Sequence, residues 1–232
     1  YGDYDDQVIK TAKACGYEVI QWSIDSQDWK DYGKESIVKT ILENKELKSY
    51  SLKELATKLS IVYQNNITPQ EITVFDMVSF ARLPYQNIFF YKQTKEDIEK
   101  INFALKETNL IEYKNTKASE LSGGQLQRVY ISMCLAQDTE IIILDEPTTF
   151  LDIKYQKSIM KLVKQLNQEL GLTIIMVLHD INQAITYSDN IVALLDGKIV
   201  KTDKAHTLLN EELLNKIYDT EIKIENNKVI SW

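Results

Sequence analysis

The residues with the clearest chemical potential are two carboxylates, Asp145 and Glu146, which directly follow the apolar run 141–144. Four consecutive apolar residues indicate a strand in the middle of a sheet. Open α/β sheets bind ligands at the carboxyl ends of their strands. Asp145 at such an end can hold the magnesium of a nucleotide, and Glu146 can polarise an attacking water as a general base. An Asp-Glu pair can also simply end a strand, so these two residues alone leave both interpretations open.

A second group, Ser122, Gly123, Gly124 and Gln125, opens a run with good helical character. The serine offers a hydroxyl, and the glycines leave their backbone amides open to a ligand. Amides at the positive end of a helix dipole favour anions such as phosphate. A glycine turn capped by serine would give the same pattern, so these residues alone do not identify a ligand.

Two further polar residues are uninformative when each is taken alone. His179 ends an apolar strand pattern, where a histidine is more often structural. Gln64 follows the pattern SIVY, and most glutamines are simply solvated. Their meaning therefore depends on what surrounds them.

The elements that must position these residues follow from hydrophobic periodicity. Apolar runs predict strands at 17–24, 60–64, 140–145 and 173–180, and a hairpin at 190–201 with Asp196-Gly197 at its turn. Helical spacing predicts helices at 5–15, 34–45, 73–82, 95–107 and from about 159 to 170, where Gly171 ends the last one. Ser51 and Glu54 form a capping-box pattern at the start of a short helix. Strands that alternate with helices from residue 60 onward predict a parallel α/β sheet.

Composition narrows the classes of function. The 232 residues carry a net charge of −7, whereas general nucleic-acid binders usually show a basic excess, so no nucleic-acid partner is expected. No apolar run approaches the roughly 20 residues of a membrane span, and the start YGDYDDQVIK is unlike a signal peptide. The two cysteines, Cys15 and Cys134, fit no metal or redox spacing and are expected to be packing residues in a reducing compartment. Two histidines are too few for a histidine-rich metal site.

The motifs in their chain order resemble the ATP-binding subunit of an ABC transporter. LSGGQ at 121–125 resembles the family signature, and IIILDEP at 141–147 resembles the Walker B strand. FLD at 150–152 resembles the D-loop, His179 the switch histidine, and Gln64 the Q-loop glutamine. The segments ITVFDMVSFARLPYQ, EPTTFLDI and HDINQAITYSD look like importers of ferric siderophores, haem or cobalamin. The resemblance covers about residues 46–232 and implies a P-loop NTPase-like fold with a helical subdomain at about 70–125.

The resemblance also implies roles, with ATP and Mg²⁺ as the cofactors. Asp145 would bind Mg²⁺ and Glu146 would act as the base, while Gln64 would touch the metal and the attacking water and His179 the γ-phosphate. The residues that would close over ATP held by a second ATPase subunit, or bridge the dimer, are Ser122, Gly123, Gly124, Gln125 and Asp152. The implied partners are transmembrane permease subunits and a dimer partner, and the implied location is the cytoplasmic face of the membrane.

One part of the family pattern is missing. A Walker A loop reads G-x-x-x-x-G-K-[ST], wraps the phosphates with its amides and reaches them with its lysine. Gly-Lys occurs in this chain only at 33–34 and 197–198, and Glu35 follows the first pair. Asp28 stands five residues before Gly33, where the pattern requires a glycine. The family's opening strands and its adenine-stacking aromatic residue are not recognisable either, so this cassette is expected to be truncated at its N-terminus.

The first 45 residues or so resemble a different family, the polysaccharide deacetylases, as a fragment from the carboxyl-terminal part of their catalytic domain. Tyr1-Gly2 would end an arginine-proline-proline-tyrosine motif, and Asp25, Asp28 and Trp29 would match a D-x-x-D-W motif. The metal ligands and the late catalytic histidine of that family are absent. We therefore expect a deacetylase-like helix–strand–helix fragment at 1–45, a cassette at 46–232, and a chimera joined near residues 45–48.

Three functions compete at this stage. The first is an ATP-hydrolysing subunit of an iron-chelate importer, defective in ATP binding because Walker A is missing. The second is an inactive chimera or dimerisation module that lends its signature motif to an intact ATPase. The third, a polysaccharide deacetylase, lacks its metal ligands. Residues 17–44 could also fill the vacant place in the sheet for packing, but Asp25, Asp28 and Asp31 would repel phosphate there.

Overall fold

The computed structural model of the chain describes residues 19–23, 50–64, 69–86, 93–195, 198–205, 207, 210–225 and 228–231. The chain divides into two compact units, Tyr1–Ser49 with Thr173–Trp232, and Tyr50–Leu172. The helices predicted at 5–15 and 34–45, and the predicted turn at 196–197, lie outside the described residues. Both units combine helices with parallel strands, so the α/β class predicted from the sequence is confirmed.

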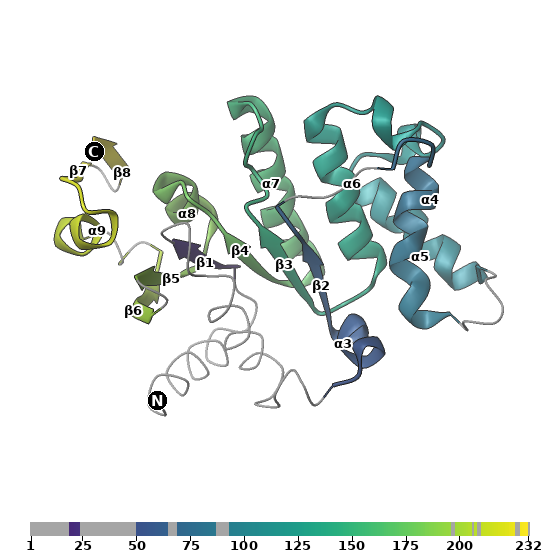
Figure 1. Cartoon of the computed structure of the whole chain (residues 1–232), viewed down its shortest axis with the longest axis horizontal. Helices are drawn as coiled ribbons and strands as arrows, with labels where there is room; N and C mark the ends of the chain where they lie inside the picture. Colours follow the sequence, from purple (N-terminus) through teal and green to yellow (C-terminus); the bar gives the residue numbers. More distant parts are fainter. Residues whose placement is uncertain are drawn as a thin grey trace. The chain divides into compact units, whose positions relative to one another are not determined.

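The unit Tyr50–Leu172 contains two parallel strands and a group of helices, which lie side by side in Figure 1. Its elements in chain order are α3 (Leu52–Lys58), β2 (Leu59–Val62), α4 (Val74–Ser79), η2 (Phe80–Tyr85), α5 (Lys95–Glu107), η3 (Ile111–Tyr113), η4 (Ala118–Glu120), α6 (Gly123–Ala136), β3 (Ile141–Asp145) and α7 (Ile153–Leu170). The helix predicted at 73–82 is thus a short α-helix continued by a 3₁₀-helix. Pro84 lies inside the 3₁₀ segment and lacks the backbone donor that a regular helix needs.

The strands β2 and β3 pair in parallel, with Ile61 opposite Ile143 and Val62 opposite Leu144. The strand predicted at 60–64 begins one residue earlier and ends two residues earlier than expected. The apolar residues of this strand predict that it is buried, which is wrong for Ile61, because this side chain is 38% exposed. Parallel pairing places the carboxyl ends of both strands at the same edge, and this edge positions the candidate site.

Reciprocal caps fix where several helices of this unit begin. Ser51 and Glu54 cap α3 as predicted, since the Ser51 hydroxyl accepts from the Glu54 amide and the Glu54 carboxylate accepts from the Ser51 amide. Thr94 and Asp97 cap α5 in the same way. Gly171 ends α7 at φ 67°, a left-handed conformation that glycine adopts without strain. The predicted ends of these helices are therefore confirmed by named contacts.

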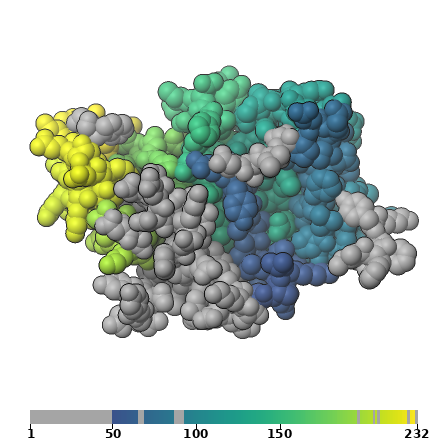
Figure 2. Space-filling model, in the orientation of Figure 1, coloured from purple at the N-terminus to yellow at the C-terminus, as the bar shows by residue number. Residues whose placement is uncertain are grey.

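The helices of this unit share an apolar core. On the face drawn in Figure 2, the blue and teal atoms of this unit lie side by side. The largest side chains buried among α5, α6 and α7 are Ile101, Leu105, Ile131, Ile159, Met160 and Leu166. The core holds α6 and α7 in place and thereby fixes the loops at their N-termini.

The unit made of Tyr1–Ser49 and Thr173–Trp232 is built on a four-stranded sheet. Its elements in chain order are β1 (Val19–Ser23), β4 (Thr173–Val177), α8 (Ile181–Tyr187), β5 (Asn190–Leu195), β6 (Lys198–Lys204), α9 (Glu211–Tyr218), β7 (Lys223–Glu225) and β8 (Lys228–Ser231). The sheet order is β4-β1-β5-β6, and β5 and β6 form the predicted antiparallel pair. A small cluster of Ile181, Leu214, Ile222 and Val229 joins α8 and α9 to the β7–β8 hairpin.

The strand β1 lies between β4 and β5 and pairs in parallel with both (Figure 1). Ile20 stands opposite Ile175 on one side and opposite Asn190 on the other. The strand predicted at 17–24 is therefore confirmed at Val19–Ser23, inside the segment that was expected to be a separate deacetylase-like fragment. A strand with partners on both sides is an interior strand, so this part of the N-terminal segment belongs to the sheet.

A proline in β1 tests this placement. We expect Gln21→Pro to lower the melting temperature, because an interior strand loses a ladder hydrogen bond when proline removes an N–H. The loss costs about 1–3 kcal/mol, and each kcal/mol corresponds to roughly 2–4 °C for a chain of this size. Gln21→Thr keeps the N–H and introduces a residue that is common in strands, so its melting temperature should lie within about a degree of that of the wild type. Equal melting of the proline variant and the wild type would show that β1 does not contribute to the stable sheet.

Candidate functional site

Two of the predicted site residues, Gln64 and Glu146, meet at the carboxyl ends of β2 and β3. Each follows shortly after its strand, and the parallel pairing brings both loops to the same edge. The Gln64 side-chain amide donates a hydrogen bond from Nε2 to Oε2 of Glu146 over 2.7 Å. Residues 82 positions apart in the sequence thus share one contact, which the sequence motifs could not specify.

Asp145 is the last residue of β3, and it is 4% exposed. The residue has other interactions, but its Oδ1 atom is buried and accepts no hydrogen bond from the described residues. A buried carboxylate oxygen of this kind fits a hard cation such as Mg²⁺, which prefers oxygen ligands. The position of Asp145 is thus compatible with the magnesium-binding role expected from the sequence.

The loop after Glu146 contains a residue that sequence reasoning missed. Thr149 donates a hydrogen bond from its hydroxyl to Oε2 of Glu146 over 2.8 Å, and its backbone N–H donates to the Glu146 carbonyl oxygen over 3.2 Å. Glu146 itself has φ 48°, in the left-handed region that non-glycine residues seldom adopt. The signal in the sequence was Pro147, since proline is favoured as the second residue of a four-residue turn.

The predicted signature residues form the N-terminus of α6, where Ser122 and Gln125 cap each other. The Ser122 amide donates to Oε1 of Gln125 over 2.9 Å, and the Gln125 amide donates to the Ser122 hydroxyl. Ser122 and Gly123 are exposed, whereas Gly124 is buried. A Cβ atom on Gly124 would lie 2.5 Å from the Tyr155 ring, so this position requires glycine for packing against α7. Tyr155 is a second residue that the motifs did not reveal.

Asp152 and its neighbours form an exposed start to α7. Asp152 is the N-cap residue, but its side chain makes no capping hydrogen bond. Phe150 is 89% exposed and has φ 63°, and Ile153 is 71% exposed. Bulky apolar side chains presented to solvent beside the signature helix are the kind of surface that a protein partner covers.

His179 belongs to the other unit, where it follows β4 in a bend. It lines a pocket of about 450 Å³ together with Asp180, Ile181, Tyr218, Thr220 and Ile222. The histidine therefore lies at the carboxyl end of a parallel strand, as expected from the sequence. Asp180 caps α8 by accepting a hydrogen bond from the Gln183 amide over 3.0 Å.

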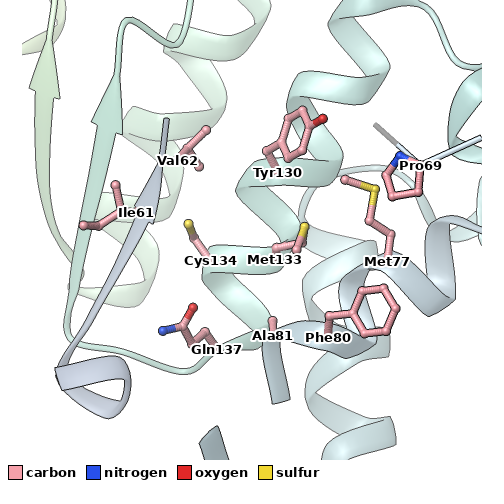
Figure 3. Close-up of a pocket in the computed structure, with 10 residues that line it drawn as sticks. All are labelled: Ile61, Val62, Pro69, Met77, Phe80, Ala81, Tyr130, Met133, Cys134 and Gln137. Carbon is pink, nitrogen blue, oxygen red and sulfur yellow. The ribbon is translucent and has the colours of Figure 1, made fainter. Parts of the chain in front are cut away.

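A second pocket, of about 390 Å³, lies beside β2 and the helices α4, η2 and α6 (Figure 3). Its lining is mostly apolar and consists of Ile61, Val62, Pro69, Met77, Phe80, Ala81, Tyr130, Met133, Cys134 and Gln137. Burial raises the pKa of the Cys134 thiol to about 12, even though a hydrogen bond with Ser60 lowers it. Cys134 thus remains a protonated packing residue, as its sequence spacing predicted.

The described residues lack two features. Within the ranges that the structure describes, no helix is long and apolar enough to cross a membrane. The same part of the chain contains no group of three or more His, Cys, Asp and Glu side chains placed to hold a metal ion.

Comparisons with known proteins agree on one family. The ABC transporter family matches residues 32–149, a range that includes Gln64, the signature residues and Glu146. The chain is 44% identical over 184 residues to the petrobactin import ATP-binding protein YclP of Bacillus subtilis (strain 168), covering 79% of this chain and 72% of that protein. It is 39% identical over 188 residues to the ferric enterobactin transport ATP-binding protein FepC of Escherichia coli (strain K12), covering 81% and 69%. The dimeric structure of MJ0796, a bacterial ABC transporter cassette, superposes with a TM-score of 0.63 at 28% identity, covering 82% of this chain and 86% of that one.

Proposed function

The chain belongs to the ABC transporter family, and we propose that it serves there as the ATP-hydrolysing subunit of an importer of iron chelates. The observation that carries this proposal is the contact of Gln64 with Glu146 beside the buried Asp145, at the shared edge of β2 and β3. Its relatives YclP and FepC are ATP-binding proteins for petrobactin import and ferric enterobactin transport. An iron chelate of the siderophore class is therefore the proposed cargo.

The chemistry assigned to these residues is hydrolysis of the γ-phosphate. Asp145 would hold Mg²⁺, which neutralises charge that develops on the phosphate oxygens. Glu146 accepts the proton of the attacking water while the water oxygen bonds to phosphorus, and ADP departs with the electron pair of the broken bond. Gln64, which contacts Glu146, would orient that water. A role for His179 at the γ-phosphate rests on the family resemblance alone.

The chain has no recognisable Walker A loop with which to bind a nucleotide itself. Among all 232 residues no stretch has the Walker A pattern, and residues 24–31 carry Asp25, Asp28 and Asp31 directly after β1. Carboxylates oppose phosphate binding because both groups carry negative charge. We therefore propose that this chain binds ATP weakly at its own site, so that hydrolysis needs a high ATP concentration. The second candidate function is that the chain lends its signature to ATP held by an intact cassette.

The proposed partners fit two surfaces of the unit Tyr50–Leu172. The exposed Phe150 and Ile153, next to the signature helix, suit a second cassette, since MJ0796 is a dimer in its solved structure. The apolar pocket in Figure 3 suits a segment of a transmembrane permease. Ile61 and Val62 of β2 line that pocket, and Gln64 follows two residues after the strand. A permease segment in the pocket would therefore lie close to the residue that contacts Glu146, the proposed base. Binding to a permease would place the chain at the cytoplasmic face of the membrane.

A capture experiment with an intact relative tests this function. We expect the chain to co-purify with a Walker A-containing relative when ATP is present and hydrolysis is blocked, because ATP would be held between the relative's phosphate loop and Ser122. Changing Ser122 to arginine should abolish capture, since the larger side chain occupies the space of the phosphate. Capture is measured for wild type and Ser122→Arg, each with and without ATP.

The control for this experiment is Lys53→Arg, an exposed substitution on α3 that leaves the signature untouched. It should be captured like the wild type. Equal capture in all conditions, or capture in none, would mean that the signature residues are present in the sequence but have no role in binding a nucleotide-loaded partner.

A further inference from the structure

The residues Glu146, Pro147, Thr148 and Thr149 form a four-residue turn that ends β3. The Thr149 N–H donates to the Glu146 carbonyl oxygen over 3.2 Å, the hydrogen bond that closes such a turn. Pro147, at the second position, restricts the backbone, and Glu146 is held at φ 48°. The turn therefore brings its fourth side chain back beside its first.

The consequence is a contact between side chains. The Thr149 hydroxyl donates to Oε2 of Glu146 over 2.8 Å, and the Gln64 amide donates to the same oxygen over 2.7 Å. The two donors differ in origin, because Thr149 belongs to the same turn as the base whereas Gln64 follows a different strand. Movement of the segment that carries Gln64 would remove one donor and leave the other in place.

We propose that Thr149 is a positioning residue that holds the Glu146 carboxylate at the end of β3, whether or not Gln64 contacts it. A glutamate side chain has several rotatable bonds, and fixing it in one orientation costs conformational entropy. A hydrogen bond from the same turn fixes the Glu146 side chain before the nucleotide binds. The conformational entropy is then lost on folding and not on nucleotide binding, as in other pre-organised sites. The proposal rests on the proposed function, since Glu146 is the base only if the chain hydrolyses ATP.

The experiment compares Thr149→Val, which removes the hydroxyl at nearly constant shape, with Thr149→Ser, which keeps it. The first readout is the ¹³C resonance of the Glu146 carboxylate in the nucleotide-free chain, assigned through Glu146→Gln. We expect the valine variant to shift this resonance and the Gln64 side-chain amide resonances, and the serine variant to restore all of them. Thr57→Val removes an exposed hydroxyl that donates to the Glu54 carbonyl on α3, and it should leave these resonances unchanged.

The second readout is ATP hydrolysis at saturating magnesium-ATP. Thr149→Val should lower kcat at least tenfold with KM within twofold of the wild type, and Thr149→Ser should recover most of the rate. A wild-type chain without hydrolysis would overturn the proposed function, and the carboxylate resonance would then decide the positioning role by itself. Identical resonances in the wild type and Thr149→Val would overturn that role, and so would a valine variant that hydrolyses ATP at the wild-type kcat.

Discussion

A calorimetric titration of the purified chain with magnesium-ATP is expected to give a dissociation constant at least a hundredfold higher than that of a Walker A-containing relative. A factor of one hundred corresponds to about 2.7 kcal/mol. The physical reason is the loss of the phosphate-wrapping amides and of the lysine that reaches the terminal phosphates. The strand β1, between β4 and β5, is followed in the sequence by IDSQDW at 24–29 rather than by glycines. Its first two acidic residues are Asp25 and Asp28.

The matched comparison is the variant Asp25→Asn with Asp28→Asn, which removes two negative charges without adding a phosphate loop. Affinity should improve by less than about tenfold, because unit charges about 4 Å apart interact by only about 1 kcal/mol in bulk water and the missing amides are not replaced. Micromolar affinity in the unaltered chain would refute the prediction. It would mean that residues 24–49 supply a phosphate site that their sequence does not reveal.

The second large effect is expected at the ion pair between Arg82 and Asp97. Arg82 Nε lies 2.9 Å from Asp97 Oδ1, and the two residues are 2% and 3% exposed. Arg82 also donates to the Ala136 carbonyl oxygen over 3.0 Å and stacks on Tyr85 with 4.1 Å to the ring centroid. Arg82→Met should therefore lower the free energy of unfolding by about 3–5 kcal/mol, the cost of leaving one partner of a buried pair without its counter-charge. Denaturant unfolding measures this loss.

The exposed pair of Lys100 and Asp138 provides the control, with Nζ 2.8 Å from Oδ2 and side chains 36% and 45% exposed. Lys100→Met should cost less than about 1 kcal/mol, since water screens exposed pairs. If Arg82→Met and Lys100→Met lower the free energy of unfolding by similar amounts, burial does not make the Arg82–Asp97 pair more important for stability than an exposed pair.

The pH dependence of stability adds a check on Asp97. Burial alone would raise the pKa of Asp97, but the Thr94 backbone N–H, the Arg82 guanidinium and the Thr94 hydroxyl together lower it below its ordinary value. A lowered pKa in the folded state stabilises the fold above the unfolded pKa of about 3.9, and this stability is lost as pH falls through the folded value. Unfolding of Asp97→Asn should accordingly depend less steeply on pH below about 4 than unfolding of the wild type.

Local sequence patterns were enough to predict those helix starts and ends that depend on contacts between residues close in the sequence. The capping box of Ser51 and Glu54 was predicted and is formed, and Gly171 ends α7 in the left-handed conformation that its position indicated. The end of β2 was less predictable, because a run of apolar residues does not show which of them face a sheet partner. Ile61 illustrates this limit, since it reads as buried and is 38% exposed.

Contacts between distant residues could not be predicted from spacing. Nothing in the sequence states that Gln64 donates to Glu146, since this follows from the parallel register of β2 and β3. Thr149 was hidden for a different reason, because a threonine in a turn is common and its contact depends on the left-handed backbone at Glu146. The roles assigned to the remaining site residues, including His179 and Asp152, stay predictions from family resemblance.

The packing of Gly124 against Tyr155 has a mechanical consequence. Because a Cβ at Gly124 would lie 2.5 Å from that ring, the backbone of α6 and the first turn of α7 are in direct van der Waals contact, and Leu151 lies beside Gly123. The N-terminus of α6 and the first turn of α7 are therefore expected to move together. We expect a ligand that displaces Ser122 to shift the first turn of α7 as well, so that closure over a nucleotide and closure of a dimer would be coupled.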